Sequence, residues 1–134
     1  MAQYLIDTQI LIWFELGSPK LKTTIYDIIA NSTNEIFVSQ ISLMEIAIKQ
    51  TTGKLIDLHW DTKTIVNQLQ KDNFVLLSIQ ESHISTYRQI PFFEQHRDPF
   101  DRFLLATSIA ESMPIVSADA NFGLYSSLVH VVKA

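Results

Sequence analysis

Gln3-Tyr4-Leu5-Ile6-Asp7 (QYLID) is the stretch of sequence that decides the fold. It is a short apolar segment at the start of the chain that ends in one acidic residue, and such runs are typical of central strands buried on both faces. The next residues, Thr8–Leu16, have a pattern that predicts a helix ending near Gly17. The chain therefore begins with a predicted central strand that leads directly into a helix, with Asp7 at the junction.

The same alternation of strand and helix continues along the chain. Further strands are predicted at residues 35–39, 74–79, 114–117 and 130–132. Further helices are predicted at residues 18–30, 42–53, 61–72, 81–89 and 98–112. Strands that alternate with helices predict an α/β fold, with a parallel sheet covered on both faces and right-handed crossovers between the strands.

Capping signals mark where several of these helices begin. Ser18-Pro19 combines an N-cap residue with a proline suited to the first helical position, which predicts a helix from there to about Ala30. Ser42 predicts another N-cap, with Glu45 in the capping-box position and Gly53 closing the helix. These signals indicate which polar side chains lie at an edge of the sheet.

Composition limits the chemistry that the protein can perform. The chain has 134 residues, of which 47% are hydrophobic, so a single packed domain over residues 1–134 is expected. It has no cysteine, so any metal must be held by oxygen or imidazole. No stretch approaches the roughly 18 apolar residues of a membrane span, and residues 4–14 lack the features of a signal peptide, so a cytoplasmic location without membrane contact is expected.

Five acidic residues are candidates to share one edge of the sheet. Ligands of parallel α/β sheets bind beyond the carboxyl ends of the strands. Asp7 and Asp119 each follow a predicted strand, and Glu45 lies in the first turns of the helix after another, so these three are expected to be neighbours. Asp101 lies near Asp98 at the start of a helix, and both join the group only if that helix begins at the same edge.

Carboxylates gathered in this way repel one another, and a fold needs a compensating cation to hold them together. Oxygen ligands without cysteine or clustered histidine favour Mg²⁺ or Mn²⁺ over Zn²⁺. Such an ion also offsets the formal net charge of −4, which is unusual for a nucleic-acid binder. Lys49, Arg97 and Arg102 are then candidates to contact phosphates, although all three could equally be surface charges or partners of neighbouring acids.

Each acid also has a purely structural interpretation. Asp7 and Asp98 could be N-caps, and for Asp98 we consider that role the better one. Glu45 could complete a capping box or pair with Lys49 four residues later. Asp101 could serve only the helix dipole, as an acid in the first turn. The functional hypothesis therefore depends on the predicted common edge and not on any one acid.

Histidines and aromatic residues carry weaker signals. The four histidines (His59, His83, His96 and His130) share no ligand-like spacing and are interpreted as surface residues or as buried residues with partners. His96 is the one whose position, beside Arg97, suits contact with a substrate. Trp13, Phe14, Phe100 and Phe103 fall in apolar helical patterns and are interpreted as core residues rather than as surfaces for base stacking.

Four segments of the chain together resemble the PIN-domain family, and within it the VapC-like toxins of type II toxin–antitoxin systems. The segments are Leu5-Ile6-Asp7-Thr8, Ser42-Leu43-Met44-Glu45-Ile46-Ala47-Ile48-Lys49, His96-Arg97-Asp98-Pro99-Phe100-Asp101-Arg102 and Ser117-Ala118-Asp119-Ala120-Asn121-Phe122. They occur in the order of the family, and the resemblance covers nearly the whole chain. Gln9 and Met44 depart from the residues that many relatives have, but neither departure removes a carboxylate.

The resemblance implies a three-layer α/β/α sandwich with a central parallel sheet. It also implies a site in which Asp7, Glu45, Asp101 and Asp119 bind Mg²⁺ or Mn²⁺, with Asp98 as an accessory residue. The implied activity is that of a ribonuclease toxin, which hydrolyses RNA phosphodiester bonds with metal-activated water. The implied partners are an RNA substrate, a second copy of the chain in a homodimer, and a small antitoxin protein.

Other interpretations stay open. The nearest is an RNA-processing nuclease of the PIN type that has no antitoxin, and a non-catalytic PIN-like binding module is another. Phosphotransferases of the haloacid-dehalogenase type also have a strand that ends in aspartate, but they need a second aspartate two positions later, where this chain has Gln9. A phospho-accepting receiver domain needs a pair of early acids, which this chain lacks.

Overall fold

Strand β1 (Gln3–Ile6) lies at the centre of the sheet in this computed structural model, which describes residues 2–55 and 57–134. The sheet has five strands in the order β3-β2-β1-β4-β5, and every neighbouring pair is parallel. The other strands are β2 (Glu35–Ser39), β3 (Val75–Leu77), β4 (Ile115–Ser117) and β5 (Val131–Lys133). The predicted parallel sheet, with the first strand in its middle, is therefore confirmed.

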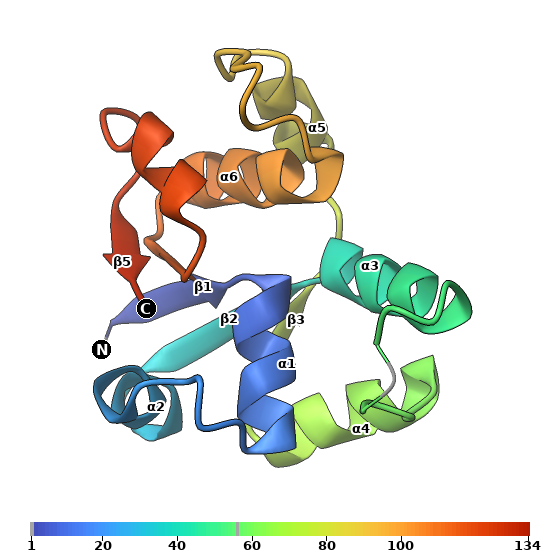
Figure 1. Ribbon diagram of the computed structural model, residues 1–134. Helices are drawn as coiled ribbons and strands as arrows, with labels where there is room; N and C mark the ends of the chain where they lie inside the picture. The colour runs from blue at the N-terminus through green and yellow to red at the C-terminus, as the bar shows by residue number, and fades with distance from the viewer. Residues whose placement is uncertain (1, 56) are drawn as a thin grey trace.

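Helices cover both faces of this sheet and give the molecule three layers (Figure 1). One layer holds α1 (Thr8–Leu16), α2 (Thr23–Ala30) and α4 (Thr62–Lys71). The other holds α5 (Glu81–Tyr87), α6 (Pro99–Glu111) and the short 3-10 helix η1 (Ala120–Tyr125). Helix α3 (Gln40–Thr51) follows β2 and contacts both α1 and α6. This is the expected α/β/α sandwich.

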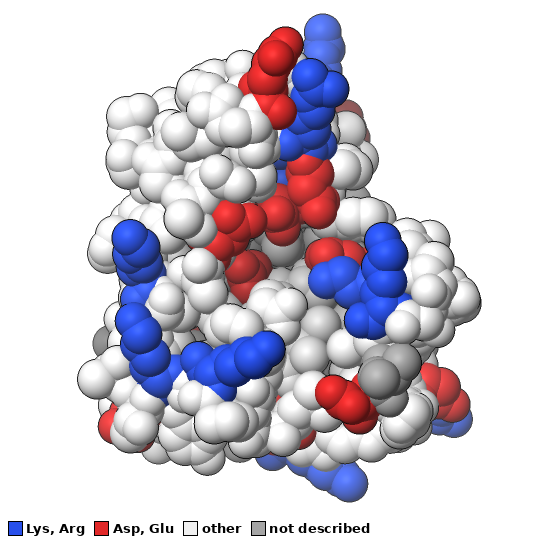
Figure 2. All heavy atoms as spheres, in the orientation of Figure 1, with Lys and Arg blue, Asp and Glu red and all other residues white. Residues whose placement is uncertain are grey.

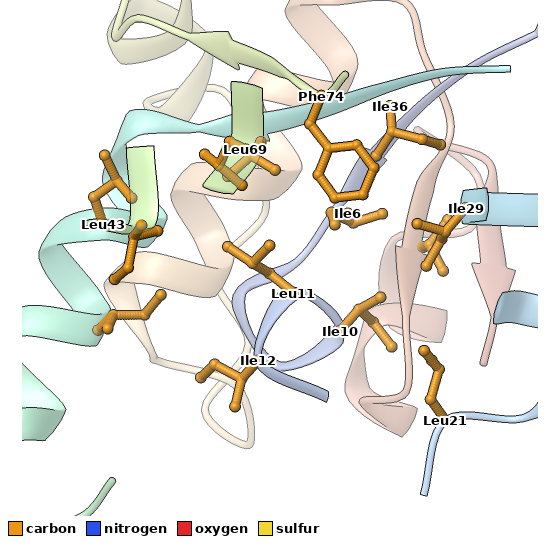
Figure 3. Packing of buried hydrophobic residues seen from close by; sticks show 14 of the residues in the cluster. Ile6, Ile10, Leu11, Ile12, Leu21, Ile29, Ile36, Leu43, Leu69 and Phe74 are labelled. Atoms are coloured by element: carbon orange, nitrogen blue, oxygen red, sulfur yellow. The ribbon is translucent and has the colours of Figure 1, made fainter. Parts of the chain in front are cut away.

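The hydrophobic core is divided by the sheet into two clusters, and β1 contributes to both. Successive side chains of a strand point to opposite faces. Leu5 accordingly packs with residues of α6 such as Leu105, whereas Ile6 packs on the other face with Ile10 and Leu11 of α1 (Figure 3). Both faces of β1 are therefore apolar, which explains its continuous apolar sequence and positions Asp7 firmly at its end.

Helix α2 begins later than the sequence predicts. Ser18-Pro19 does not start a helix, because the Ser18 hydroxyl accepts a hydrogen bond from the Lys20 N–H at 3.2 Å and the Ser18 carbonyl accepts one from the Leu21 N–H at 3.2 Å. These residues form a turn that brings Leu21 into the core, and α2 starts at Thr23. The prediction was wrong because serine followed by proline suits the first two positions of a turn as well as a helix start.

Helix α3 begins earlier than predicted. Its N-cap is Ser39, whose hydroxyl accepts a hydrogen bond from the Ile41 N–H at 3.2 Å, so β2 passes into α3 without a loop. Ser42 is buried inside the helix, and its hydroxyl oxygen accepts a hydrogen bond from the Thr8 hydroxyl at 2.9 Å. Glu45 is therefore not in a capping-box position, and it lies further along α3 than a helix starting at Ser42 implies.

The remaining elements agree with the sequence to within a few residues. Helix α1 ends at Gly17 in the left-handed conformation (φ 62°), and Asp61 and Asp98 are the N-caps of α4 and α6. Helix α5 ends at Tyr87 instead of residue 89, and β3 is shorter than the apolar run at residues 74–79. Among the described residues, no helix has the length and apolar character needed to cross a membrane.

Candidate metal centre

A cleft with a volume of about 300 Å³ lies at the carboxyl edge of the sheet, where β1 and β4 end and α1 and α6 begin. Figure 2 shows acidic side chains gathered in the middle of the visible face, with basic side chains on either side. The residues that line the cleft are Asp7, Thr8, Gln9, Trp13, Glu45, Lys49, Asp98, Asp101, Ala118 and Asp119. The structure thus brings together the three acids that the sequence placed at this edge and the two that it placed there only on a condition, Asp98 and Asp101.

Asp7 is an N-cap and also lines the acidic cleft. Its Oδ1 accepts a hydrogen bond from the Ile10 N–H at 2.8 Å, so it is the N-cap of α1. Its side chain also belongs to the acidic group, with only 4% of the residue exposed. Burial and the charges of Glu45 and Asp119 raise the pKa of Asp7, hydrogen bonds from Ser117 and Ile10 lower it, and the net result is a pKa of about 6.

Glu45 projects from α3 into the same cleft. Its Oε2 lies 3.3 Å from the Lys49 ammonium group, which confirms the predicted pair four residues apart. Its Oε1 is buried and has no hydrogen-bond partner among the described residues. An unpaired carboxylate oxygen in a buried position is unfavourable, and a bound cation satisfies it. This oxygen is the most direct indication that the cleft fits a metal ion.

Helix α6 begins at the edge of the sheet where the other acids lie, which meets the condition set by the sequence. Asp98 is its N-cap, and its Oδ1 accepts hydrogen bonds from the N–H groups of Phe100 at 2.8 Å and Asp101 at 3.2 Å. Asp98 is exposed, so its structural role is clear while its side chain still lines the cleft.

Asp101 is the acid whose ionisation changes most. Burial and, after it, the charges of Asp98, Asp7, Glu45 and Asp119 together raise its pKa to about 8. Four separate carboxylates therefore act on Asp101, which shows that the residues converge electrostatically as well as geometrically.

Asp119 completes the group from the strand next to β1. Its N–H donates to the Ser117 hydroxyl at 3.0 Å, and its Oδ1 accepts from the Asn121 N–H at 2.9 Å, so it caps η1. One ligand atom from each of Asp119, Asp101 and His96 lies within 4.8 Å of the others, a spacing that suits a metal ion.

His96 is closer to the acids than its sequence position alone indicates. It is buried, its Nε2 lies 3.2 Å from Asp101 Oδ2, and its Nδ1 lies 2.8 Å from the Tyr125 hydroxyl. Burial lowers the pKa of His96 below its ordinary value, although the neighbouring carboxylates of Asp119 and Asp98 raise it. The only signal in the sequence was its place in the segment that also carries Asp98 and Asp101.

Two of the three basic residues proposed to contact phosphate remain available. Lys49 lines the cleft, where it pairs with Glu45. Arg97 is exposed, with its guanidinium 3.8 Å from the carboxylate of Glu94 and above the ring of Phe92. An exposed pair of this kind is weak, so Arg97 can exchange this partner for another anion.

Arg102 requires a correction. The sequence suggested a contact with phosphate, but the residue is only 6% exposed and does not line the cleft. Its guanidinium donates to the carbonyl oxygens of Pro91 at 2.9 Å and Ile90 at 3.4 Å, and it stacks on the ring of Tyr87. Through these contacts, Arg102 holds the segment before α6 in place.

The other histidines lie as expected, but the prediction that Phe100 and Phe103 are core residues was wrong. His59 and His130 are exposed, and His83 is buried with its Nε2 2.7 Å from Glu111 Oε2. Trp13 packs against the core and also lines the cleft, which gives it a position that the sequence did not indicate. Phe14 packs against the core, whereas Phe100 and Phe103 line an apolar surface depression between α5 and α6.

Comparisons with known proteins agree with this architecture. The family model described as PIN domain matches residues 4–127. No curated protein sequence matches the chain. A similar fold occurs in VapBC2 from Rickettsia felis bound to a promoter DNA fragment, with a TM-score of 0.68, 16% identity and 98% of each chain covered. Another occurs in FitAcB from Neisseria gonorrhoeae, with a TM-score of 0.63, 19% identity, and 97% of this chain and 96% of that chain covered. VapBC-5 from Mycobacterium tuberculosis, of the VapBC family of toxin–antitoxin systems, is also similar, with a TM-score of 0.63, 13% identity and 100% of each chain covered.

Replacing Asp101 with Asn should stabilise the metal-free protein, and the gain should be larger at high pH. The pKa of Asp101 is raised from 3.8 to about 8, so the folded state favours the protonated form. The raised pKa of Asp101 therefore contributes to the stability of the folded state fully below about pH 4, and this contribution is lost as the pH rises through about 8. In EDTA, the melting temperature of the wild type should therefore fall between about pH 5 and about pH 8 more steeply than that of Asp101→Asn.

Asp61→Asn is the matched control for this measurement. Asp61 is an exposed N-cap that does not line the cleft. Hydrogen bonds from Thr64 lower its pKa, so its contribution to stability is lost as the pH falls. Asp61→Asn should therefore not raise the melting temperature at high pH. The interpretation of Asp101 as a strained member of an acidic group is wrong if Asp101→Asn follows the wild-type pH dependence.

Proposed function

Because this chain belongs to the PIN domain family, we propose that it is a Mg²⁺-dependent ribonuclease that acts as the toxin of a type II toxin–antitoxin system. PIN domains are generally nucleases, so the reaction class is hydrolysis of phosphodiester bonds. The observation that carries the proposal is the convergence of Asp7, Glu45, Asp101 and Asp119 on one cleft, where one oxygen of Glu45 is buried without a partner.

The chemistry of this donor set fits a hard divalent cation. Carboxylate oxygens favour Mg²⁺, and Mn²⁺ accepts the same ligands. Asp7 and Asp101 would be the main ligands, and Glu45 and Asp119 would complete the set directly or through water. When bound, the cation supplies positive charge that offsets the charge developing at phosphorus and makes a water nucleophilic.

The residues of the chain itself provide binding and orientation. Lys49 lies in the cleft and Arg97 is exposed on the segment that precedes α6, so these two are the proposed contacts to RNA phosphates. Asp98 is the proposed accessory acid, since it lines the cleft while it caps α6. All of these groups stand on or next to helix ends, which are rigid supports for a catalytic site.

An antitoxin and a second copy of the chain are the proposed protein partners. A ribonuclease that is free in the cytoplasm, where we expect this protein, threatens its own cell and needs an inhibitor. The similar structure from M. tuberculosis is described as a member of the VapBC family of toxin–antitoxin systems. A cleft that gathers acids suits an inhibitor that presents an Arg or Lys side chain to it.

The first test of this proposal is RNA cleavage. The purified protein should cleave RNA with Mg²⁺ or Mn²⁺ and should stop when EDTA is added. Asp7→Asn and Asp101→Asn should each lower the cleavage rate by about 100-fold, because each removes a group that stabilises developing charge. Asp27→Asn, the same change on the exposed surface of α2, should behave as the wild type. Activity that persists in EDTA would contradict the metal-dependent mechanism.

A second test measures the metal without RNA. Asp7→Asn should melt at a higher temperature than the wild type in EDTA, because the loss of one charge relieves repulsion on the order of 1–3 kcal/mol. Asparagine can keep the N-cap of α1, so the helix start is preserved. Mg²⁺ should then stabilise the wild type, since it binds only the folded site, and should stabilise the variant much less. An equal response of both proteins to Mg²⁺ would place Asp7 outside the metal site.

A third test separates a toxin from a housekeeping nuclease. Expression of the chain alone should arrest bacterial growth, and co-expression with the small protein encoded by the neighbouring gene should restore growth. Asp101→Asn should be harmless in both cases. Equal growth with and without the neighbouring gene product, in cells where RNA cleavage is confirmed, would instead support a PIN-type RNA-processing nuclease without an antitoxin.

A further inference from the structure

A row of buried hydrogen bonds lies behind Asp101. It begins at the guanidinium of Arg102, whose Nη1 is 3.5 Å from the Tyr125 hydroxyl. The same hydroxyl lies 2.8 Å from His96 Nδ1, and His96 Nε2 lies 3.2 Å from Asp101 Oδ2. Arg102, Tyr125 and His96 are 6%, 0% and 4% exposed, so solvent has little access to the row.

The direction of these hydrogen bonds follows from the chemistry of Arg102. A guanidinium has only donors and keeps its charge at all ordinary pH values, so the Tyr125 oxygen accepts the bond from Arg102. The proton of the Tyr125 hydroxyl then needs an acceptor of its own, because an unpaired buried donor is unfavourable. Within residues 2–55 and 57–134, the other hydrogen-bond partner of this hydroxyl is His96 Nδ1.

His96 Nδ1 is therefore an acceptor without a proton, and the ring proton must be on Nε2. From that position the Nε2–H group donates to Asp101 Oδ2. One oxygen of Asp101 is thus held from behind, and the other is left for a cation. A carboxylate fixed in this way loses less rotational freedom when it binds a metal.

We propose that His96 is a positioning residue for Asp101, and that Arg102 and Tyr125 set its tautomer so that the Nε2–H group faces the carboxylate. This inference rests on the proposed function, in which Asp101 is a metal ligand. It also gives a role to Arg102, which does not line the cleft and is therefore not a phosphate contact. Arg102 follows Asp101 in α6, and adjacent helical residues project about 100° apart, so one faces the cleft and the other the network behind it.

His83 provides a matched control within the same fold. It is also buried, its Nδ1 accepts a hydrogen bond from the Gln80 N–H at 3.1 Å, and its Nε2 lies 2.7 Å from Glu111 Oε2. Glu111 ends α6, whereas Asp101 is in its first turn, and neither His83 nor Glu111 lines the cleft. A change at His83 therefore removes the same kind of buried contact without touching the metal ligands.

The first experiment needs no metal. The ¹⁵N chemical shifts of the imidazole in the metal-free protein should show His96 as the neutral Nε2–H tautomer. Tyr125→Phe keeps the ring and removes the hydroxyl, so a fraction of the Nδ1–H tautomer should appear. A wild type in the Nδ1–H form would overturn the proposal, and an unchanged tautomer in Tyr125→Phe would overturn the part assigned to Tyr125 and Arg102.

The second experiment measures Mn²⁺ binding by calorimetry without RNA. His96→Asn cannot reach Asp101 and should weaken Mn²⁺ binding roughly 10-fold, the usual effect of losing a partner of a metal ligand. His96→Gln places an amide N–H near the position of Nε2 and should recover most of the affinity. His83→Asn should lower the melting temperature in EDTA but leave the Mn²⁺ affinity at the wild-type value.

The outcomes separate this inference from the proposed function. If the wild type binds no Mn²⁺, both the proposed metal site and this inference fail. If the wild type binds Mn²⁺ and His96→Asn binds it equally well, or if His83→Asn loses as much affinity, the inference alone fails. Should His96→Asn not fold, Tyr125→Phe takes its place, and an Mn²⁺ affinity equal to that of the wild type would overturn the proposal.

Discussion

Carboxylates crowded at the carboxyl edge of the sheet repel one another, and burial strengthens this repulsion because little water screens it. Burial is the larger cause of the raised pKa values of Asp7 and Asp101, and the charges of the neighbouring carboxylates add to it. The protein offsets part of this repulsion with groups of its own, such as the Ile10 N–H on Asp7 and the Lys49 ammonium on Glu45. What remains is strain that a bound cation relieves, and such strain is common at functional sites.

The topology leaves the acids little freedom to move apart. All five strands are parallel, so their carboxyl ends and the starts of α1 and α3 meet at one edge. Strand β1 is packed on both faces, by Leu5 on one side and Ile6 on the other, and Asp7 follows it without a loop. The same N-cap bonds that begin helices thus hold carboxylates in place, so the structural and functional interpretations of Asp7 do not exclude each other.

The buried hydrogen bonds that join Arg102, Tyr125, His96 and Asp101 have a different origin. Arg102 and His96 come from the segment around the start of α6, but their partner Tyr125 comes from η1, which follows β4. Close packing of η1 against α6 and the preceding segment brings the three side chains together. Structures that share this fold at under 20% identity show that the scaffold tolerates extensive change in sequence.

Local periodicity and capping were enough to predict the parallel sheet, the central place of β1, the helices α1, α4 and α6, and the shared edge of the acids. Each of these depends on neighbouring residues in the sequence or on the rule that the carboxyl ends of parallel strands lie at one edge of the sheet. Periodicity and capping were not enough for the starts of α2 and α3, since Ser18 and Ser42 carry signals that also suit a turn or a helix interior. The burial of Arg102 and the contacts of His96 were decided only by tertiary structure. Whether a charged or polar side chain is buried depends on partners such as Tyr125, which lie far away in the sequence and come close only after the chain has folded.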